Sequence, residues 1–119
     1  MEKVNIREKL DQFQDHWNPR IIAELNGQHV KATKLKGEFI FHQHDNEDEL
    51  FLVIKGKLKM EFRDKVIEIN PGEFLVVPRK VEHKPVADEE VEILLFEPAS
   101  TLNTGNVVNE RTRSALEKI

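Results

Sequence analysis

The spacing of hydrophobic residues along the chain changes near residue 18. Before that point apolar residues recur on one helical face, which predicts a helix over residues 5–17, capped by Asn5 and ended by Asn18-Pro19. From residue 20 to 98, apolar and polar residues alternate along short segments separated by turn residues roughly every eight to twelve positions. This pattern is typical of an all-β sandwich or barrel, so we expect a short N-terminal helix followed by about eight strands.

Two of the expected strand pairs are hairpins. Asn26-Gly27 favours a tight turn between residues 20–25 and 28–35. Residues 58–62 and 67–69 alternate apolar and charged side chains, so one face of this pair is expected in the core and the other in water. The side chains that we place inside the barrel are Ile40, Phe51, Val53, Met60, Phe62, Ile67 and Ile69.

The last part of the chain is polar up to Asn109, and the apolar spacing beyond it allows a C-terminal helix over residues 110–119. A length of 119 residues suits one compact domain and is short for two. We therefore expect a single domain over residues 1–119, with the barrel at about 20–98 and a tail at 99–119.

Composition excludes several classes of protein. The chain is 39% hydrophobic and 34% charged, as a globular domain is, and its net charge of −4 without a basic cluster argues against a nucleic-acid partner. A single helix before Pro19 is too little for a helix-turn-helix. No apolar run approaches the roughly 18 residues of a membrane span and the N-terminus opens charged, so we expect a cytoplasmic protein without a membrane partner.

Candidate chemistry is concentrated in three of the five histidines and one glutamate: His42, His44, Glu49 and His83. Residues two apart on a strand share a face, so His42 and His44 are expected to point to one side. A turn-linked antiparallel strand would bring Glu49 beside them, and His83 would close the group from across the interior. An isolated His-x-His pair is more often a packing feature, but Glu49 and His83 together make a metal site the better interpretation.

The absence of cysteine means that a metal must be held by nitrogen and oxygen atoms. Three imidazoles and one carboxylate suit one divalent transition metal ion, either tetrahedral Zn or a six-coordinate Fe, Mn, Ni or Co with positions left for a small ligand. The remaining histidines, His16 and His29, are interpreted as ordinary solvent-side residues. The acidic run at residues 45–48 lacks the ligand spacing of a calcium loop and is interpreted as a solvated turn.

These residues lie along two motifs, and in both the chain resembles the cupin superfamily, whose small single-domain members carry a type-2 cupin barrel. The residues along the first motif, G(X)5HXH(X)3-4E(X)6G, are Gly37, His42, His44, Glu49 and Gly56. Those along the second, G(X)5PXG(X)2H(X)3N, are Gly72, Pro78 and His83. Three positions depart from the pattern: Gly37 is one residue closer to His42 than usual, Lys80 replaces the second glycine and Ala87 the final asparagine.

The resemblance implies a small jelly-roll β-barrel, usually a homodimer, that binds one divalent ion through His42, His44, Glu49 and His83. Two classes of function stay open: a metal-dependent enzyme acting on a small organic molecule, dioxygenase-like or isomerase-like, and a non-catalytic module that binds metal or a small ligand. A phosphosugar pocket needs inward Arg or Lys, and only Arg79, Lys80 and Lys84 near the rim are expected to serve. We therefore favour a compact apolar or aromatic substrate with an oxygen chelating group, in a pocket that includes Phe51, Met60 and Phe62.

The outer face of the same strands is also apolar. It carries Phe39 and Phe41 opposite the histidines, together with Leu50, Leu52 and Ile54. A sheet wetted on one side does not show this pattern, so we expect either the N-terminal helix or a second subunit to cover that face.

Overall fold

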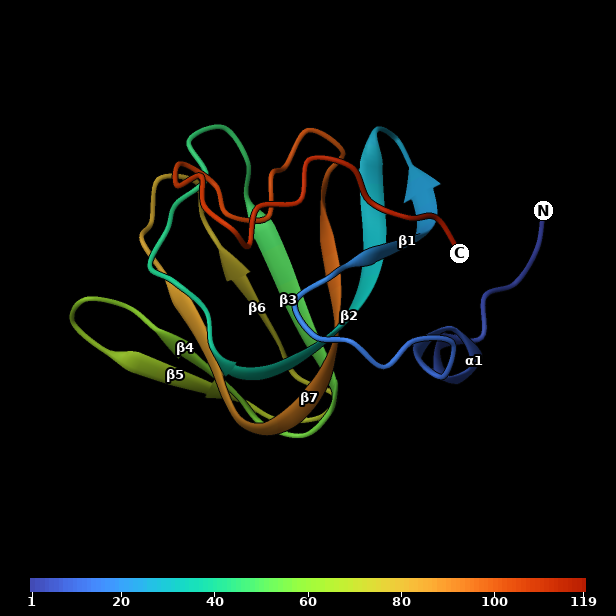
Figure 1. The fold of residues 1–119 in the computed structure, drawn as a ribbon, viewed down its shortest axis with the longest axis horizontal. Helices are drawn as coiled ribbons and strands as arrows, with labels where there is room; N and C mark the ends of the chain where they lie inside the picture. The colour runs from blue at the N-terminus through green and yellow to red at the C-terminus, as the bar shows by residue number, and fades with distance from the viewer.

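Seven antiparallel strands form the body of the molecule (Figure 1). The computed structural model describes residues 1–119. The one helix is α1, Ile6–Leu10. The strands, in chain order, are β1 Arg20–Leu25, β2 Gln28–Glu38, β3 Glu49–Lys55, β4 Leu58–Glu61, β5 Val66–Ile69, β6 Phe74–Val77 and β7 Lys84–Pro98. The predicted all-β class with a short N-terminal helix is confirmed, with seven strands instead of about eight.

Strand β7 holds the sheet together because it pairs with three other strands. The sheet order is β1-β2-β7-β3-β6, and β4 pairs with both β5 and β7. The first part of β7 lies against β4, where Val86 is opposite Lys59, and its second part lies between β2 and β3, where Ile93 is opposite both Thr33 and Val53. This double use of one strand of 15 residues curls the sheet into a barrel-like fold.

The hairpin between β1 and β2 follows the predicted turn. Leu25 lies opposite Gln28, so Asn26 and Gly27 are the two central residues, with φ values of 50° and 76°. Both values are positive, as the favoured two-residue hairpin turn requires, and Asn and Gly tolerate this conformation best.

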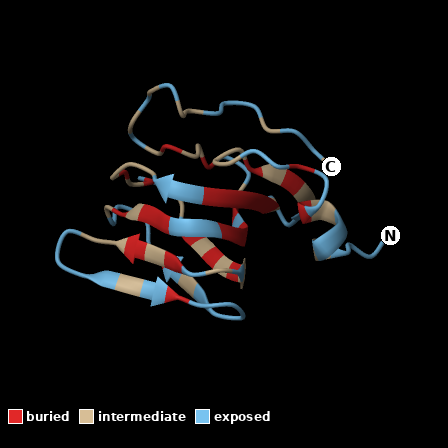
Figure 2. Ribbon diagram, turned by 60° about the horizontal axis from the view of Figure 1, so that its bottom comes forward, coloured by how far each residue is buried: buried red, intermediate tan, exposed pale blue.

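The interior of the barrel is filled by eleven buried apolar residues from β2, β3, β4, β5, β6 and β7. Figure 2 shows the alternation of buried and less buried positions along these strands. Of the predicted interior residues, Phe51, Val53, Met60 and Ile69 belong to this cluster. The others lie at its margin: Phe62 and Ile67 pack against it, and Ile40 is half-buried outside it.

Helix α1 is much shorter than the predicted helix over residues 5–17. Its start is confirmed, because the Asn5 side chain accepts a hydrogen bond from the Glu8 amide at 3.0 Å, but it ends at Leu10. The apolar residues that suggested a longer helix pack in two separate places. Phe13 packs on the outer face of the sheet, whereas Trp17 adopts a left-handed φ of 58° and packs against the interior cluster.

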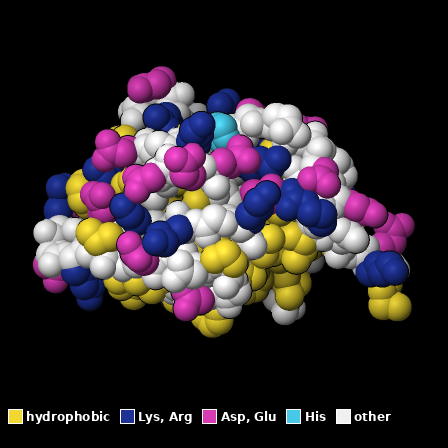
Figure 3. All heavy atoms as spheres, turned by 90° about the horizontal axis from the view of Figure 1, so that it is seen from below, with side chains coloured by type: hydrophobic (Ala, Val, Ile, Leu, Met, Phe, Trp, Pro, Cys, Tyr) yellow, Lys and Arg dark blue, Asp and Glu magenta, His cyan; other side chains and the backbone are white.

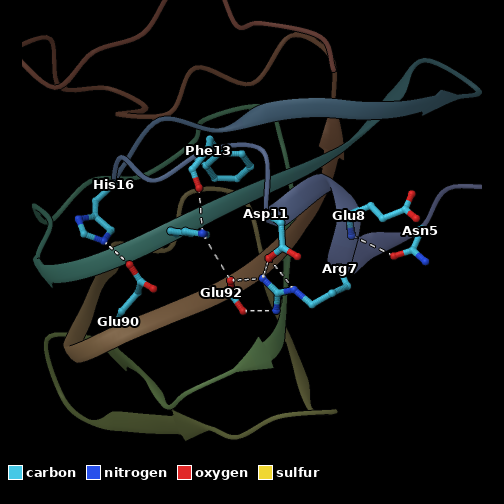
Figure 4. Close-up of polar contacts among 9 residues, drawn as sticks. Asn5, Arg7, Glu8, Asp11, Phe13, His16, Glu90 and Glu92 are labelled. Atoms are coloured by element: carbon cyan, nitrogen blue, oxygen red, sulfur yellow. Dashed lines mark hydrogen bonds and ion pairs between the residues drawn. The ribbon is translucent and has the colours of Figure 1, made fainter.

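The N-terminal segment covers part of the outer face of β2 and β7. Leu10 and Phe13 pack there on Ala32 and Leu94, with Leu52 and Ile54 at the margin. Figure 4 shows the polar contacts that fasten the segment: Arg7 forms two hydrogen bonds to Glu92, at 2.7 and 2.6 Å, and Lys34 donates to the Phe13 carbonyl at 2.9 Å. The first of the two covers expected for this face is therefore present over Leu52 and Ile54.

The predicted C-terminal helix is absent. Residues 99–119 instead run as an irregular segment across one end of the barrel and back to β1 (Figure 1). There Ile21 donates to the Glu117 carbonyl at 2.9 Å and Ile119 donates to the Ile21 carbonyl at 3.0 Å. These bonds pair the backbone of Ile21 on the free edge of β1, so the extended conformation is favoured over a helix. The one helix, α1, lacks the length and apolar character that crossing a membrane requires.

Candidate metal centre

The structure brings together all four residues of the predicted metal site. One nitrogen or oxygen atom from each of His42, His44, Glu49 and His83 lies within 4.8 Å of the corresponding atoms of the others. All four side chains are buried, with exposed fractions of 1–4%. A buried, convergent set of this kind is unlike the exposed acidic groups that commonly occur without an ion.

The backbone arrangement that produces this convergence differs from the prediction. His42 and His44 do not lie in a regular strand, and β3 pairs with β6 and β7 instead of with the histidine segment. His42 instead forms an isolated antiparallel bridge with His83, with hydrogen bonds of 3.1 and 2.9 Å between their backbones. Glu49, the first residue of β3, then reaches the group from the neighbouring wall of the barrel.

Two of the histidines are held in a defined tautomer. His42 Nδ1 lies 2.9 Å from the Ile40 carbonyl oxygen, and His83 Nδ1 lies 2.9 Å from the Val81 carbonyl oxygen. A carbonyl oxygen accepts but cannot donate, so each Nδ1 carries a proton and donates it. In the neutral ring the lone pair is then on Nε2, which is the arrangement that metal-binding histidines use.

The free atoms of the group fit a cation. Glu49 Oε1 lies 3.2 Å from His44 Nε2 and 3.3 Å from His83 Nε2, yet all three atoms lack a hydrogen-bond partner. A carboxylate oxygen facing the lone pair of His83 Nε2 is repulsive unless a cation lies between them. Ligand atoms held about 2.1 Å from one ion are themselves roughly 3.0–3.4 Å apart, so the observed spacing suits a shared metal ion.

Electrostatics keep the group ready to bind a cation. Burial, with a further contribution from His83, lowers the pKa of His42 from 6.5 to about 4. Burial alone would raise the pKa of Glu49, but the adjacent carboxyl group of Glu97 and the contacts with His44 and His83 outweigh it and hold that pKa well below its usual range. At neutral pH the site therefore presents an unprotonated His42 and an ionised carboxylate.

A cavity adjoins the group. It offers about 40 Å³ to the centres of water molecules, and its lining includes His42 and Glu49 together with Phe51 from the predicted pocket. Met60 lies in the barrel core outside this lining, and Phe62 lines a separate groove with Arg63 and Pro78.

The cavity also contains charged residues that the sequence interpretation missed. Lys31 and Glu97 line it, each 2% exposed, and Lys31 Nζ donates to Glu97 Oε1 at 2.7 Å. Burial, followed by the negative charge of Glu49, raises the pKa of Glu97 well above its usual range. The expectation that only rim residues could supply a cation is therefore wrong: Lys31 is inside, whereas Arg79 is exposed and paired with Asp48.

The C-terminal segment closes over this end of the barrel. Asn106 and Gln43 exchange two hydrogen bonds, from the Asn106 amide to the Gln43 carbonyl at 3.0 Å and from the Gln43 amide to the Asn106 side chain at 2.9 Å. Gly105 lies so close that a Cβ atom there would overlap the Gln43 carbonyl oxygen and lie 3.3 Å from a ring carbon of His42. The metal group is thus covered by a segment that is distant from it in sequence.

Aromatic rings form one wall of the cavity. Trp17 stacks on Phe39 with ring centres 4.8 Å apart, and Phe39 contacts His42 edge-on at 5.3 Å. The expectation that Phe39 lies on the outer face, opposite the histidines, is therefore wrong. The guanidinium group of Arg111, from the C-terminal segment, lies 5.5 Å from the centre of the Trp17 ring. Because Trp17 is the only tryptophan, its fluorescence reports on this cavity.

Comparison with known families agrees with the fold and the four clustered side chains. The sequence profile of the cupin domain matches residues 32–97, which is more than half of the chain. The chain therefore belongs to the cupin family.

Individual relatives support this assignment. The chain is 33% identical over 64 residues to the protein YdbB of Bacillus subtilis strain 168, and this match spans 53% of the chain and 57% of YdbB. A cupin-2 domain protein from Shewanella frigidimarina superposes with a TM-score of 0.79 at 45% identity, over 80% of this chain and 93% of that one. Protein NMB1881 from Neisseria meningitidis superposes with a TM-score of 0.75 at 28% identity, over 82% and 100% of the two chains.

Proposed function

We propose that this cupin holds one divalent transition metal ion through His42, His44, Glu49 and His83. The observation that carries the proposal is the set of buried ligand atoms without hydrogen-bond partners, His44 Nε2, His83 Nε2 and Glu49 Oε1, which face one another at 3.2 and 3.3 Å. Leaving such atoms buried and unpaired is costly, and a shared cation removes that cost for all of them at once.

We propose further that the protein is a metal-dependent enzyme acting on a small organic molecule in the adjoining cavity. A bound divalent ion would supply a Lewis acid, with coordination positions left for an oxygen ligand if the ion is six-coordinate. Support comes from the lining of the cavity, because a molecule held there lies against His42 and Glu49. Trp17, Phe39 and Phe51 line the cavity and limit the size of such a molecule.

A non-catalytic module that binds metal or a small ligand is the second candidate. The observation that favours it is the arrangement of titratable groups in the cavity. Glu49 belongs to the metal group and Lys31 is paired with Glu97, so neither is free to act as a general acid or base. The two candidates therefore differ in turnover and not in ligand binding.

The metal is tested by elemental analysis of protein purified without a polyhistidine tag and reconstituted with Fe, Mn, Ni, Co or Zn. We expect one ion per chain in the wild type and loss of the ion in a His42→Ala/His83→Ala double variant. The matched control is His16→Ala/His29→Ala, which also removes two histidines but leaves the cluster intact. Substoichiometric metal in the reconstituted wild type, or equal metal in both double variants, contradicts the proposal.

Turnover is tested on the metal-loaded protein. The Fe(II)-loaded protein is incubated with a panel of thiols, diketones and catechols while oxygen consumption is recorded. The metal-loaded protein is also incubated with small hydroxy-carbonyl compounds while isomerisation is followed by NMR. Consumption or isomerisation that is absent from the His42→Ala/His83→Ala variant supports an enzyme, and inactivity of a fully metal-loaded protein in both assays supports the binding module.

We also propose that the protein is a homodimer that associates through the uncovered part of the outer sheet face. Val76 on β6 lies opposite Leu50 on β3, which in turn lies opposite Phe96 on β7, so these side chains form a row across three strands. Phe74, Val76 and Phe96 have exposed fractions of 63%, 48% and 37%. Seen from below, hydrophobic side chains gather along the lower part of the molecule while charged ones crowd the upper part (Figure 3). A second copy would cover the apolar row that the N-terminal segment leaves open.

A further inference from the structure

Lys31 occupies an unusual position for a lysine. It lies on β2 with 2% of its surface exposed and lines the cavity that adjoins the metal group. Lysine side chains are rarely buried completely, and a buried ammonium group needs acceptors for its hydrogen atoms. The structure gives it one acceptor, Glu97 Oε1 at 2.7 Å.

The hydrogen bonding of this pair is incomplete on both sides. An ammonium group has three N–H donors, and the bond to Glu97 uses one of them. On the other side of the pair, the buried Glu97 Oε2 accepts no hydrogen bond, and the group beside Glu97 is the carboxyl of Glu49. A purely structural ion pair is stable only when its remaining donors and acceptors are also satisfied, so this pair is better suited to a cavity that receives a polar ligand.

Charge favours an anionic ligand. Glu49 contributes one negative charge, Lys31 contributes one positive charge, and a divalent ion adds two positive charges. The sum stays positive whether Glu97 is ionised or protonated. A buried site with a net positive charge is stabilised by an anion that displaces water from it.

Size restricts that anion to a small one. The cavity offers about 40 Å³ to the centres of water molecules, which is room for only a few of them. A carboxylate with one further oxygen, the size of glycolate, suits this space better than a sugar phosphate does.

We propose that Lys31 is a specificity-determining residue that binds the carboxylate group of a small organic acid, while a second oxygen of the same molecule reaches the metal group. This inference rests on the proposed metal site and names the substrate class that the site selects. It replaces the apolar or aromatic substrate expected from the sequence. Glu97 orients the lysine by accepting one of its hydrogen bonds.

The test is a comparison of glycolate with its neutral amide, glycolamide, on Ni-loaded protein, because six-coordinate Ni²⁺ leaves positions for an oxygen ligand and keeps its oxidation state. Binding is measured by calorimetry and by the fluorescence of Trp17, which lines the cavity. We expect the wild type to prefer glycolate, and Lys31→Met to weaken glycolate binding by roughly 10- to 100-fold with little effect on glycolamide. The collapse of this preference is a result that a purely structural role does not produce.

The chain offers a closely matched control in Lys34. It lies on the same strand, is 4% exposed, and bonds to the Phe13 carbonyl under the N-terminal segment instead of facing the cavity. Lys34→Met is therefore expected to keep the wild-type preference for glycolate. If Lys31→Met folds poorly, Lys31→Met/Glu97→Gln removes both charges of the buried pair and serves the same purpose.

The outcomes separate the two proposals. Equal binding of glycolate and glycolamide by the wild type, or an unchanged preference in Lys31→Met, overturns the role of Lys31 even when each chain holds one Ni ion. A wild type that holds none of Fe, Mn, Ni, Co and Zn overturns the proposed metal site. In that case, acetate binding to the metal-free protein decides the role of Lys31, which is supported by weaker binding in Lys31→Met and overturned by equal binding.

Discussion

His42 and His83 are joined through their backbones before their side chains meet: each amide donates to the carbonyl of the other, at 3.1 and 2.9 Å. Each ring is also fixed by a hydrogen bond from Nδ1 to the carbonyl oxygen two residues earlier in the chain. The site is therefore held in place by the fold, and the ion is not needed to assemble it. Because the chain loses little conformational entropy when an ion binds to such a preformed site, binding stabilises the folded state.

Metal removal is expected to lower the thermal stability of the protein. A ligand present at about 100 times its dissociation constant stabilises the folded state by about 2.7 kcal/mol, and a domain of this size then melts roughly 10 °C higher. Calorimetry with and without a strong chelator measures the difference. The His42→Ala/His83→Ala variant should melt at the same temperature in both conditions, and a chelator effect of equal size in that variant would contradict metal binding at this site.

The stability of the metal-free protein is expected to depend on pH through His42. Its pKa is lowered from 6.5 to about 4 by burial and by the neighbouring His83. Between these values the unfolded chain binds a proton that the folded chain does not, so stability rises with pH across this window. The stabilisation is present above pH 6.5 and is lost as the pH falls toward about 4, by at most about 3 kcal/mol.

Glu97 opposes this effect, so the measurement must be a difference between variants. Its raised pKa makes the folded chain hold an extra proton above pH 4.5, which lowers stability as the pH rises from there toward the folded-state pKa. Urea unfolding is measured in chelator at about pH 7, 5.5 and 4.5 for the wild type and for His42→Gln. The difference in unfolding free energy between the two proteins cancels the contribution of Glu97. We expect the wild type to lose more stability than His42→Gln on acidification. Parallel pH profiles would show that His42 does not titrate as described.

The parts of the fold that were predicted from the sequence are those set by local rules. The turn at Asn26-Gly27 follows from the backbone preferences of two residues, and the four clustered side chains follow from their spacing in two motifs. The helix over residues 5–17 was wrong after Leu10 because tertiary packing decides where Phe13 and Trp17 go. Helical spacing of apolar residues cannot distinguish one buried face from two separate burial sites.

The charged lining of the cavity was missed because β2 is buried on both faces. With Leu35 inside the barrel, strand alternation also places Thr33 and Lys31 inside, while Ala32 packs under the N-terminal segment. The same reasoning from Leu95 places Glu97 inside. Counting every second residue from a core residue was therefore the signal that could have identified Lys31 and Glu97 as inward-facing. The burial of a lysine, however, runs against the general preference of charged groups for water.

The cytoplasmic location stays a prediction.

The proposed dimer is tested by placing charge on the uncovered apolar row. Phe74→Lys/Phe96→Lys would bring like charges together in a symmetric interface, and we expect the mass in solution to fall from twice to once 13.9 kDa. Light scattering after size exclusion measures this mass. The control is Val108→Lys, which changes a valine that is 79% exposed in the C-terminal segment. A monomeric wild type, or a double variant that stays dimeric, would contradict the proposed interface.

Gly105 is expected to control how the C-terminal segment covers the metal group. In Gly105→Ala the new methyl group would overlap the Gln43 carbonyl oxygen and press on the ring of His42, and the φ of 55° adds backbone strain. Gly27→Ala is the matched control, because Gly27 also has a positive φ, 76°, but has no atom within 4 Å of its added Cβ. We expect Gly27→Ala to cost about 1 kcal/mol through backbone strain alone and to leave metal affinity unchanged. Gly105→Ala should cost about 2–4 kcal/mol and weaken metal binding by roughly 10-fold, because the segment must move away from His42. Urea unfolding and a zinc titration decide between these results, and equal zinc affinity in the two variants would show that the C-terminal segment does not position the metal ligands.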